Sequence, residues 1–99
     1  MKIGSGNARE PRSAMYLRGI VKHPLHLQPL IVTIKNLSAS GMMAEAATEF
    51  SAGDRIEVEI PRIGLVAATV AWARDMRFGA RFDVKIDPAA AKRSITARA

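Results

Sequence analysis

Two short stretches of the sequence contain side chains that could bind a phosphorylated ligand. NLSASG, from Asn36 to Gly41, combines an amide, a hydroxyl two residues on and a glycine three further. At alternating positions of a strand, Asn36 and Ser38 would share one face and could bond a ligand, and Gly41 would let that ligand approach the backbone. REPR places Arg9 and Arg12 around a Glu-Pro pair of restricted shape, so two guanidinium groups could bind phosphate or a guanine edge.

Each stretch also has an ordinary structural interpretation. Asn36 and Ser38 can bond backbone groups two residues on, and Gly41 can adopt a positive φ in a turn. Arg9 and Arg12 can be two exposed arginines on a tail. Taken one at a time, both stretches favour these structural interpretations. The functional interpretation depends on the two stretches occurring together.

The composition indicates one domain with a modest core. The chain has 99 residues, 48% of them hydrophobic, and no cysteine. This size supports one domain, and the lack of cysteine excludes a disulfide framework and thiolate metal or redox chemistry. No apolar run approaches the length needed to cross a bilayer, and the first residues do not form a secretory signal. We therefore expect no membrane insertion and a cytoplasmic location.

The charge distribution is uneven along the chain. The net charge is +6, from 15 basic and 9 acidic residues, and the basic ones gather in the first and last thirds. If the fold brings these two parts together, it makes a positive face suited to a phosphate-bearing partner. Charge alone, however, favours a solvated surface that keeps the protein in solution.

Short strands are the elements that must position these residues. Period-two alternation is clearest in RIEVEI and in two later segments joined by RDMR, which fits a hairpin connection. The residues expected to share an inward face in the two later segments are Val66, Ala68, Val70 and Trp72, and then Phe78, Ala80, Phe82, Val84 and Ile86. Strands are also expected over 13–21, in LIVTIKNLS with Val32 and Ile34 on one face, and in MMAE, with HPLHLQP as a loop.

The chain is expected to end in a short α-helix. Asp87 and Pro88 supply an N-cap and a first helical position before an alanine run. The result is an all-β fold of five or six short antiparallel strands with this helix. A closed barrel is the expected architecture because closure removes exposed strand edges. We expect a flexible arm over 1–8, a barrel domain over 9–88 and a helix or tail over 89–99.

The two stretches taken together resemble the PilZ domain family. Arginines stand before the first strand, Asn-x-Ser-x-x-Gly ends the second, and GDRIEVEIP and the VAW…FGARF pair are similar to the family's later strands. The resemblance covers roughly residues 9–88. It implies a six-stranded antiparallel β-barrel of the split-barrel type with a C-terminal helix. It also implies binding of the bacterial second messenger cyclic di-GMP.

The resemblance implies roles for individual residues. Arg12 matches the second arginine of the family's Arg-x-x-x-Arg element, which reads guanine and phosphate. Asn36, Ser38 and Gly41 match the Asp/Asn-x-Ser-x-x-Gly element, which lines the other side of the guanine site. Together with Arg9, these residues are the predicted cyclic di-GMP site.

One position departs from the family pattern, and it leaves two functions open. Ala8 stands four residues before Arg12, where the family has arginine, and Arg9 lies one position too close. If Arg9 reaches the ligand, the chain is a cyclic di-GMP receptor that orders its arginine arm and signals to an unidentified effector protein. If it does not, the chain could be an adaptor of the same fold that binds a protein and no nucleotide.

Other functions have weaker support. A third hypothesis is a small basic barrel that binds single-stranded nucleic acid, but few aromatic residues are available for stacking, so no DNA or RNA partner is expected. His23 and His26 lie in the proline-containing loop with no Asp, Glu or Cys nearby, so no metal site and no cofactor are expected. No nucleophile–base pair or phosphate-cradling glycine loop is present, so the chain is not expected to be an enzyme.

Three further side chains have both a structural and a functional interpretation. Trp72 could stack a base, but its register with the neighbouring valines favours the core. Arg77 and Arg81 share the outer face of the last strand. There they could form a solvated face or an auxiliary phosphate contact.

Overall fold

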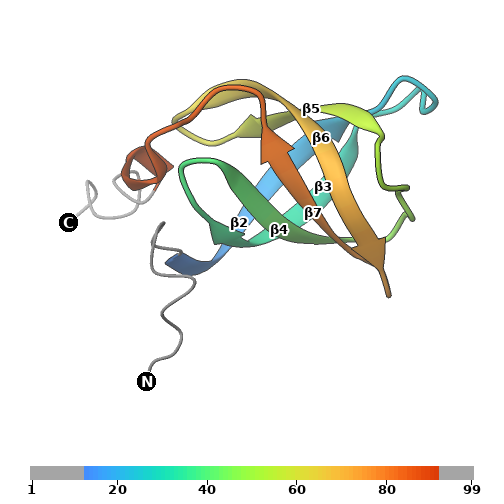
Figure 1. Cartoon of the computed structure of the whole chain (residues 1–99), viewed down its shortest axis with the longest axis horizontal. Helices are drawn as coiled ribbons and strands as arrows, with labels where there is room; N and C mark the ends of the chain where they lie inside the picture. The colour runs from blue at the N-terminus through green and yellow to red at the C-terminus, as the bar shows by residue number, and fades with distance from the viewer. Residues whose placement is uncertain (1–12, 92–99) are drawn as a thin grey trace.

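The computed structural model describes residues 13–91, which form a closed barrel of six antiparallel strands followed by one helical turn (Figure 1). The strands are β2 (Ser13–Lys22), β3 (Leu30–Leu37), β4 (Gly41–Ala46), β5 (Arg55–Ile60), β6 (Gly64–Arg74) and β7 (Arg77–Phe82). Their order around the barrel is β2-β3-β4-β7-β6-β5, and β5 pairs with β2 to close it. The predicted six-stranded barrel is confirmed. Arg9 and Arg12 lie outside the described residues.

Alternation of apolar and polar side chains along the strands builds the core. In β5, three apolar side chains are buried while the charged residues between them are exposed. Val32 and Ile34 of β3 are likewise buried, as predicted. Because successive side chains point to opposite faces of a strand, a strand with this pattern contributes one apolar row to the interior. Phe50 closes part of this interior against Phe78, with ring centroids 4.5 Å apart.

The β6–β7 hairpin has the tight turn that RDMR predicts. Arg74 pairs with Arg77, which leaves Asp75 and Met76 as a two-residue loop. Both loop residues have a positive φ, of 55° and 63°. This is the backbone that a two-residue hairpin needs to match the twist of its strands.

Two residues of the predicted inward rows lie on the outside. The β6–β7 pairing shifts register between Val70 and Trp72, and this irregularity turns Trp72 outward, where it is 41% exposed. β7 ends at Phe82, so Val84 is no longer held in the strand and is 72% exposed. The prediction was wrong at both positions because a simple period of two reports neither a bulge nor the end of a strand.

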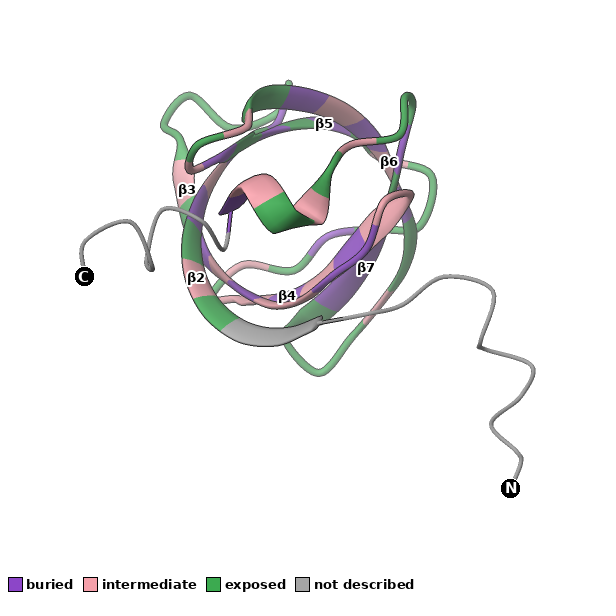
Figure 2. Cartoon of the chain, turned by 90° about the vertical axis from the view of Figure 1, so that its left-hand side faces the viewer, coloured by how far each residue is buried: buried purple, intermediate pink, exposed green. Residues whose placement is uncertain are grey.

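A helical turn over residues 88–91 covers one end of the barrel (Figure 2). Asp87 caps it as predicted, because its Oδ1 accepts the N–H of Ala89 at 3.0 Å. The segment before it braces the β3–β4 turn: the Phe82 N–H donates to the Ser40 carbonyl at 2.8 Å, and the Ile86 N–H to the Ala39 carbonyl at 2.9 Å. In the part of the chain that the structure describes, no helix has the length and apolar character to span a membrane.

Candidate ligand-binding face

The β3–β4 turn brings Ser38 and Gly41 into direct contact. The Ser38 N–H donates to the Gly41 carbonyl at 2.9 Å. The Ser38 hydroxyl donates to the same carbonyl and accepts the Gly41 N–H, both at 3.2 Å. Ser38 is also buried. The hydroxyl therefore shapes the turn, in the way that the structural interpretation of this stretch predicts.

Gly41 is needed because the β7 backbone comes very close to it. A Cβ built on Gly41 would lie 2.5 Å from the carbonyl oxygen of Ala80. Its φ is not positive, since the described glycines with a positive φ are Gly53 and Gly64. The suggestion that Gly41 takes a left-handed turn conformation is therefore wrong, and a close approach of two strands explains the glycine instead.

Asn36 lies on the outer surface of the barrel near the end of β3. The β3–β4 pairing shifts register between Ile34 and Asn36, while the inward residues Ile34 and Leu37 are fully buried. The side-chain amide of Asn36 forms no hydrogen bond with any part of the chain between residues 13 and 91. Its two donors and its acceptor are therefore available to a ligand.

Strand β2 brings the beginning of the chain to the same place. Ser13 pairs with Leu37 and Ala14 pairs with Asn36. Arg12 immediately precedes Ser13 in the sequence. The attachment point of the arginine arm is therefore next to Asn36 and the turn that follows it.

A row of paired residues continues around the barrel from Asn36 to an exposed aromatic ring. Asn36 pairs with Met43, Met43 with Gly79, and Gly79 with Trp72. Neighbouring strands are about 4.8 Å apart, so these three steps span about 14 Å of the surface. We call Asn36, Met43, Gly79 and Trp72 the outer row.

Trp72 owes its place in the outer row to the glycine opposite it. A Cβ on Gly79 would overlap the indole nitrogen of Trp72, so the ring lies over this glycine. The sequence interpretation assigned Trp72 to the core and missed its place on this face. The glycine in FGARF was the available signal, because an aromatic side chain can cover a glycine on the neighbouring strand.

The acidic residues beside the outer row are paired with cations. Glu45 is 3.1 Å from the Nε of Arg77 and 3.4 Å from the Nζ of Lys35. Asp83 receives two hydrogen bonds of 2.8 Å from the guanidinium of Arg55, and these bonds lower the pKa of its carboxyl. Lys35 also lies 4.6 Å from the ring centroid of Tyr16. Little negative charge on this face remains to repel an anionic ligand.

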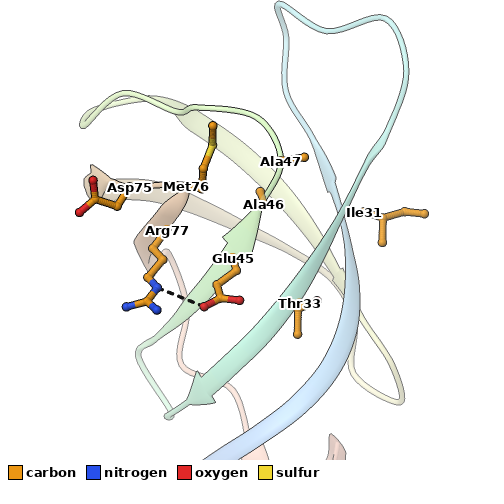
Figure 3. Close-up of a pocket in the computed structure, with 8 residues that line it drawn as sticks. All are labelled: Ile31, Thr33, Glu45, Ala46, Ala47, Asp75, Met76 and Arg77. Carbon is orange, nitrogen blue, oxygen red and sulfur yellow. Dashed lines mark hydrogen bonds and ion pairs between the residues drawn. The ribbon is translucent and has the colours of Figure 1, made fainter.

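A shallow hollow of about 480 Å³ lies over β3, β4 and the β6–β7 turn (Figure 3). Its lining consists of Ile31, Thr33, Glu45, Ala46, Ala47, Asp75, Met76 and Arg77. The hollow includes the Glu45–Arg77 ion pair. On β4, Glu45 lies two residues after Met43, in the direction away from Gly41. Of the predicted site residues that the structure describes, Asn36, Ser38 and Gly41, none lines the hollow.

His23 is a buried structural residue, although it was predicted to be a loop histidine without an acidic neighbour. Its Nε2 is 2.9 Å from Oδ2 of Asp54, and its Nδ1 accepts the Leu25 N–H at 3.0 Å. The hydrogen bond that Asp54 accepts from the Ser51 N–H, and then the bond with His23, lower the pKa of Asp54. The fold brings Asp54 here from 31 residues away. No cluster of three or more metal-binding side chains occurs among residues 13–91.

The fold and the outer row define a small closed barrel with a polar and aromatic patch on the outside of its wall. The PilZ domain model matches residues 7–97, so the chain belongs to the PilZ domain family. The predicted family is confirmed.

Two solved structures show the same fold. The Bacillus subtilis inhibitor of motility, MotI/DgrA, aligns with a TM-score of 0.60 and 14% identity over 91% of this chain and 50% of that chain. This chain therefore spans about half the length of that protein. The PilZ domain with c-di-GMP of YcgR from Escherichia coli aligns with a TM-score of 0.57 and 20% identity, covering 86% of this chain and 83% of that one. No curated protein sequence matches the chain.

Proposed function

We propose that this chain is a cyclic di-GMP receptor that passes the signal to an effector protein. Its membership of the PilZ family supports the proposal, as does the c-di-GMP carried by the YcgR domain of the same fold. The single observation that carries it is the pairing of Ser13 with Leu37, because it anchors the arginine arm beside Asn36. The proposal requires no metal, cofactor or catalytic step, and it places the receptor in the cytoplasm.

The residues of this site have different tasks. The guanidinium of Arg12 binds a phosphate or the O6/N7 edge of a guanine through two parallel hydrogen bonds. The free amide of Asn36 supplies donors and an acceptor to the same base. Ser38 and Gly41 hold the turn that orients Asn36, and the exposed ring of Trp72 offers a stacking surface for a base.

The switch in this proposal is the ordering of the arm. Phosphate groups attract Arg9 and Arg12 to the barrel wall, so the ligand shifts the arm toward one bound arrangement. β5 closes the barrel by pairing with β2 at Ile20, Val21 and Lys22 only, so the first part of β2 has no partner strand on that side among the described strands. The effector then recognises the surface that the ordered arm alters.

Calorimetric titration of cyclic di-GMP into the wild type, Arg12→Ala and Lys22→Ala tests the proposal. Lys22→Ala is a matched control, because this variant removes the same positive charge at the opposite end of β2, where Lys22 pairs with Glu57. We expect the wild type and Lys22→Ala to bind equally. Arg12→Ala should bind about tenfold more weakly or worse, as the loss of a charge-assisted bond implies. The absence of heat from the wild type at high micromolar ligand would refute the receptor function.

The alternative is a PilZ-fold adaptor that binds a protein and no nucleotide. Ala8, at the position of the family's first arginine, favours this function. The variant Ala8→Arg separates the two. If the wild type does not bind cyclic di-GMP and Ala8→Arg does, the chain is an adaptor whose nucleotide site was lost through this residue.

A further inference from the structure

We propose that Arg81 contacts a phosphate of the ligand from the barrel wall and so replaces the arginine that the arm lacks at Ala8. This inference rests on the proposed cyclic di-GMP site. Arg81 is an exposed residue of β7 that pairs with Gly41 of the β3–β4 turn. It therefore lies on the outer face, one strand away from that turn.

The charge of Arg81 is not neutralised by its surroundings. Arg77, four residues earlier on the same face of β7, is paired with Glu45 at 3.1 Å. Asp83, two residues later, is held by both terminal nitrogens of Arg55 at 2.8 Å. The guanidinium of Arg81 forms no hydrogen bond or ion pair with residues 13–91. Its guanidinium is therefore available to an anion at the edge of the outer row.

The position of Arg81 fits a ligand that also touches Asn36. The Cα atoms of Asn36 and Arg81 are separated by two strand spacings across the sheet and by two residues along the strand. They therefore lie about 12 Å apart. An extended arginine side chain and a phosphate group together fill this distance. Trp72 lies opposite Gly79, two residues before Arg81, so a base stacked on the indole would bring its phosphate close to the same guanidinium.

The backbone of Arg81 is held on both sides. It pairs with Gly41 of β4 and with Thr69 of β6, so the guanidinium starts from a fixed strand position. A contact from a fixed position costs less ordering entropy than one from a chain segment that must be immobilised. The planar guanidinium also matches two oxygens of a phosphodiester, which a lysine ammonium does not.

Titration of cyclic di-GMP into Arg81→Ala, Arg81→Lys, Arg12→Ala and Lys22→Ala tests this inference. Arg81→Ala should weaken binding by about tenfold or more, because one charge-assisted contact is lost. Arg81→Lys should fall between Arg81→Ala and the wild type. Lys22→Ala, which removes the same charge far from the site, should bind within about twofold of the wild type. Unchanged thermal unfolding of Arg81→Ala would show that the barrel is intact.

The outcomes distinguish this inference from the proposed function. If Arg12→Ala loses binding while Arg81→Ala binds like the wild type, Arg81 makes no contact and the receptor function stands. If Arg81→Ala and Lys22→Ala weaken binding equally, the effect is one of overall charge and the inference is wrong. If the wild type does not bind cyclic di-GMP, both the receptor function and this role of Arg81 are refuted.

Discussion

The substitution Gly41→Ala tests whether the glycine of the β3–β4 turn is needed for strand packing. The new Cβ would lie 2.5 Å from the Ala80 carbonyl oxygen, and contacts under 3.0 Å essentially never occur for a real Cβ. The β4 and β7 backbones must therefore separate by about 0.5 Å at this point. The obstructing atom belongs to the backbone of a paired strand, so no side-chain rotation relieves the contact.

The expected cost combines two opposing effects. Overpacking of this kind typically costs about 1–3 kcal/mol, and the lower unfolded-state entropy of alanine returns about 0.4–1 kcal/mol. We expect a net loss of about 1–2 kcal/mol in the free energy of unfolding. In a domain of this size, such a loss lowers the melting temperature by roughly 5–15 °C.

Urea and thermal unfolding of Gly41→Ala should be compared with those of Gly19→Ala. At Gly19 the new Cβ would meet the tip of the Ile34 side chain at 2.9 Å, which can move, so a much smaller loss is expected. Equal stability of the two variants, or a Gly41→Ala as stable as the wild type, would contradict the packing argument. The glycine would then have to be explained by ligand access instead.

Three further outcomes follow from contacts in the barrel. Ser38→Ala should lose about 1 kcal/mol in urea unfolding, because the hydroxyl that bonds both backbone groups of Gly41 is removed; an unchanged midpoint would exclude this role. Ile34→Val removes the Cδ1 atom that Gly19→Ala would crowd, so the double variant should be more stable than the sum of the single effects predicts; strict additivity would refute the contact. The pKa of Asp54 is lowered from 3.8 in the folded state, so its stabilising contribution is present above pH 3.8 and is lost as the pH falls through the folded value. Acid titration of the unfolding free energy should therefore be flatter for Asp54→Asn than for the wild type, and identical curves would disprove this contribution.

The strands could be predicted because each has one solvent-exposed face and one apolar face. Ile56 and Val58 alternate with charged residues, and this pattern needs no knowledge of the neighbouring strands. Trp72 could not be placed in the same way, because the register shift before it depends on how β6 pairs with β7. The His23–Asp54 contact was missed for a similar reason, since it joins residues that only the closed barrel brings together.

The proximity of Asn36, Ser38 and Gly41 could be predicted from the sequence, whereas the contacts that each of them makes could not; their role in binding stays a prediction. Asn36, Ser38 and Gly41 were found by their spacing, and the structure places them at one end of β3. The hydrogen bonds of Ser38 and the strand contact of Gly41 depend on the geometry of the turn and on β7, which spacing does not encode. The same holds for Arg81, whose guanidinium has no partner among residues 13–91 because the neighbouring charges pair with one another.

Two backbone hydrogen bonds join the β3–β4 turn to residues 82–86, and they limit where a reporter group can be attached. The carbonyls of Ser40 and Ala39 accept hydrogen bonds from the segment that leads into the helical turn, so a label attached within residues 83–87 would disturb the turn that carries Ser38. The loop over residues 23–29 lies at the opposite end of β3 (Figure 1), and Leu27 in it is fully exposed. A fluorophore attached to this loop would leave the β3–β4 turn undisturbed. The anisotropy of its emission would report the tumbling of the whole barrel.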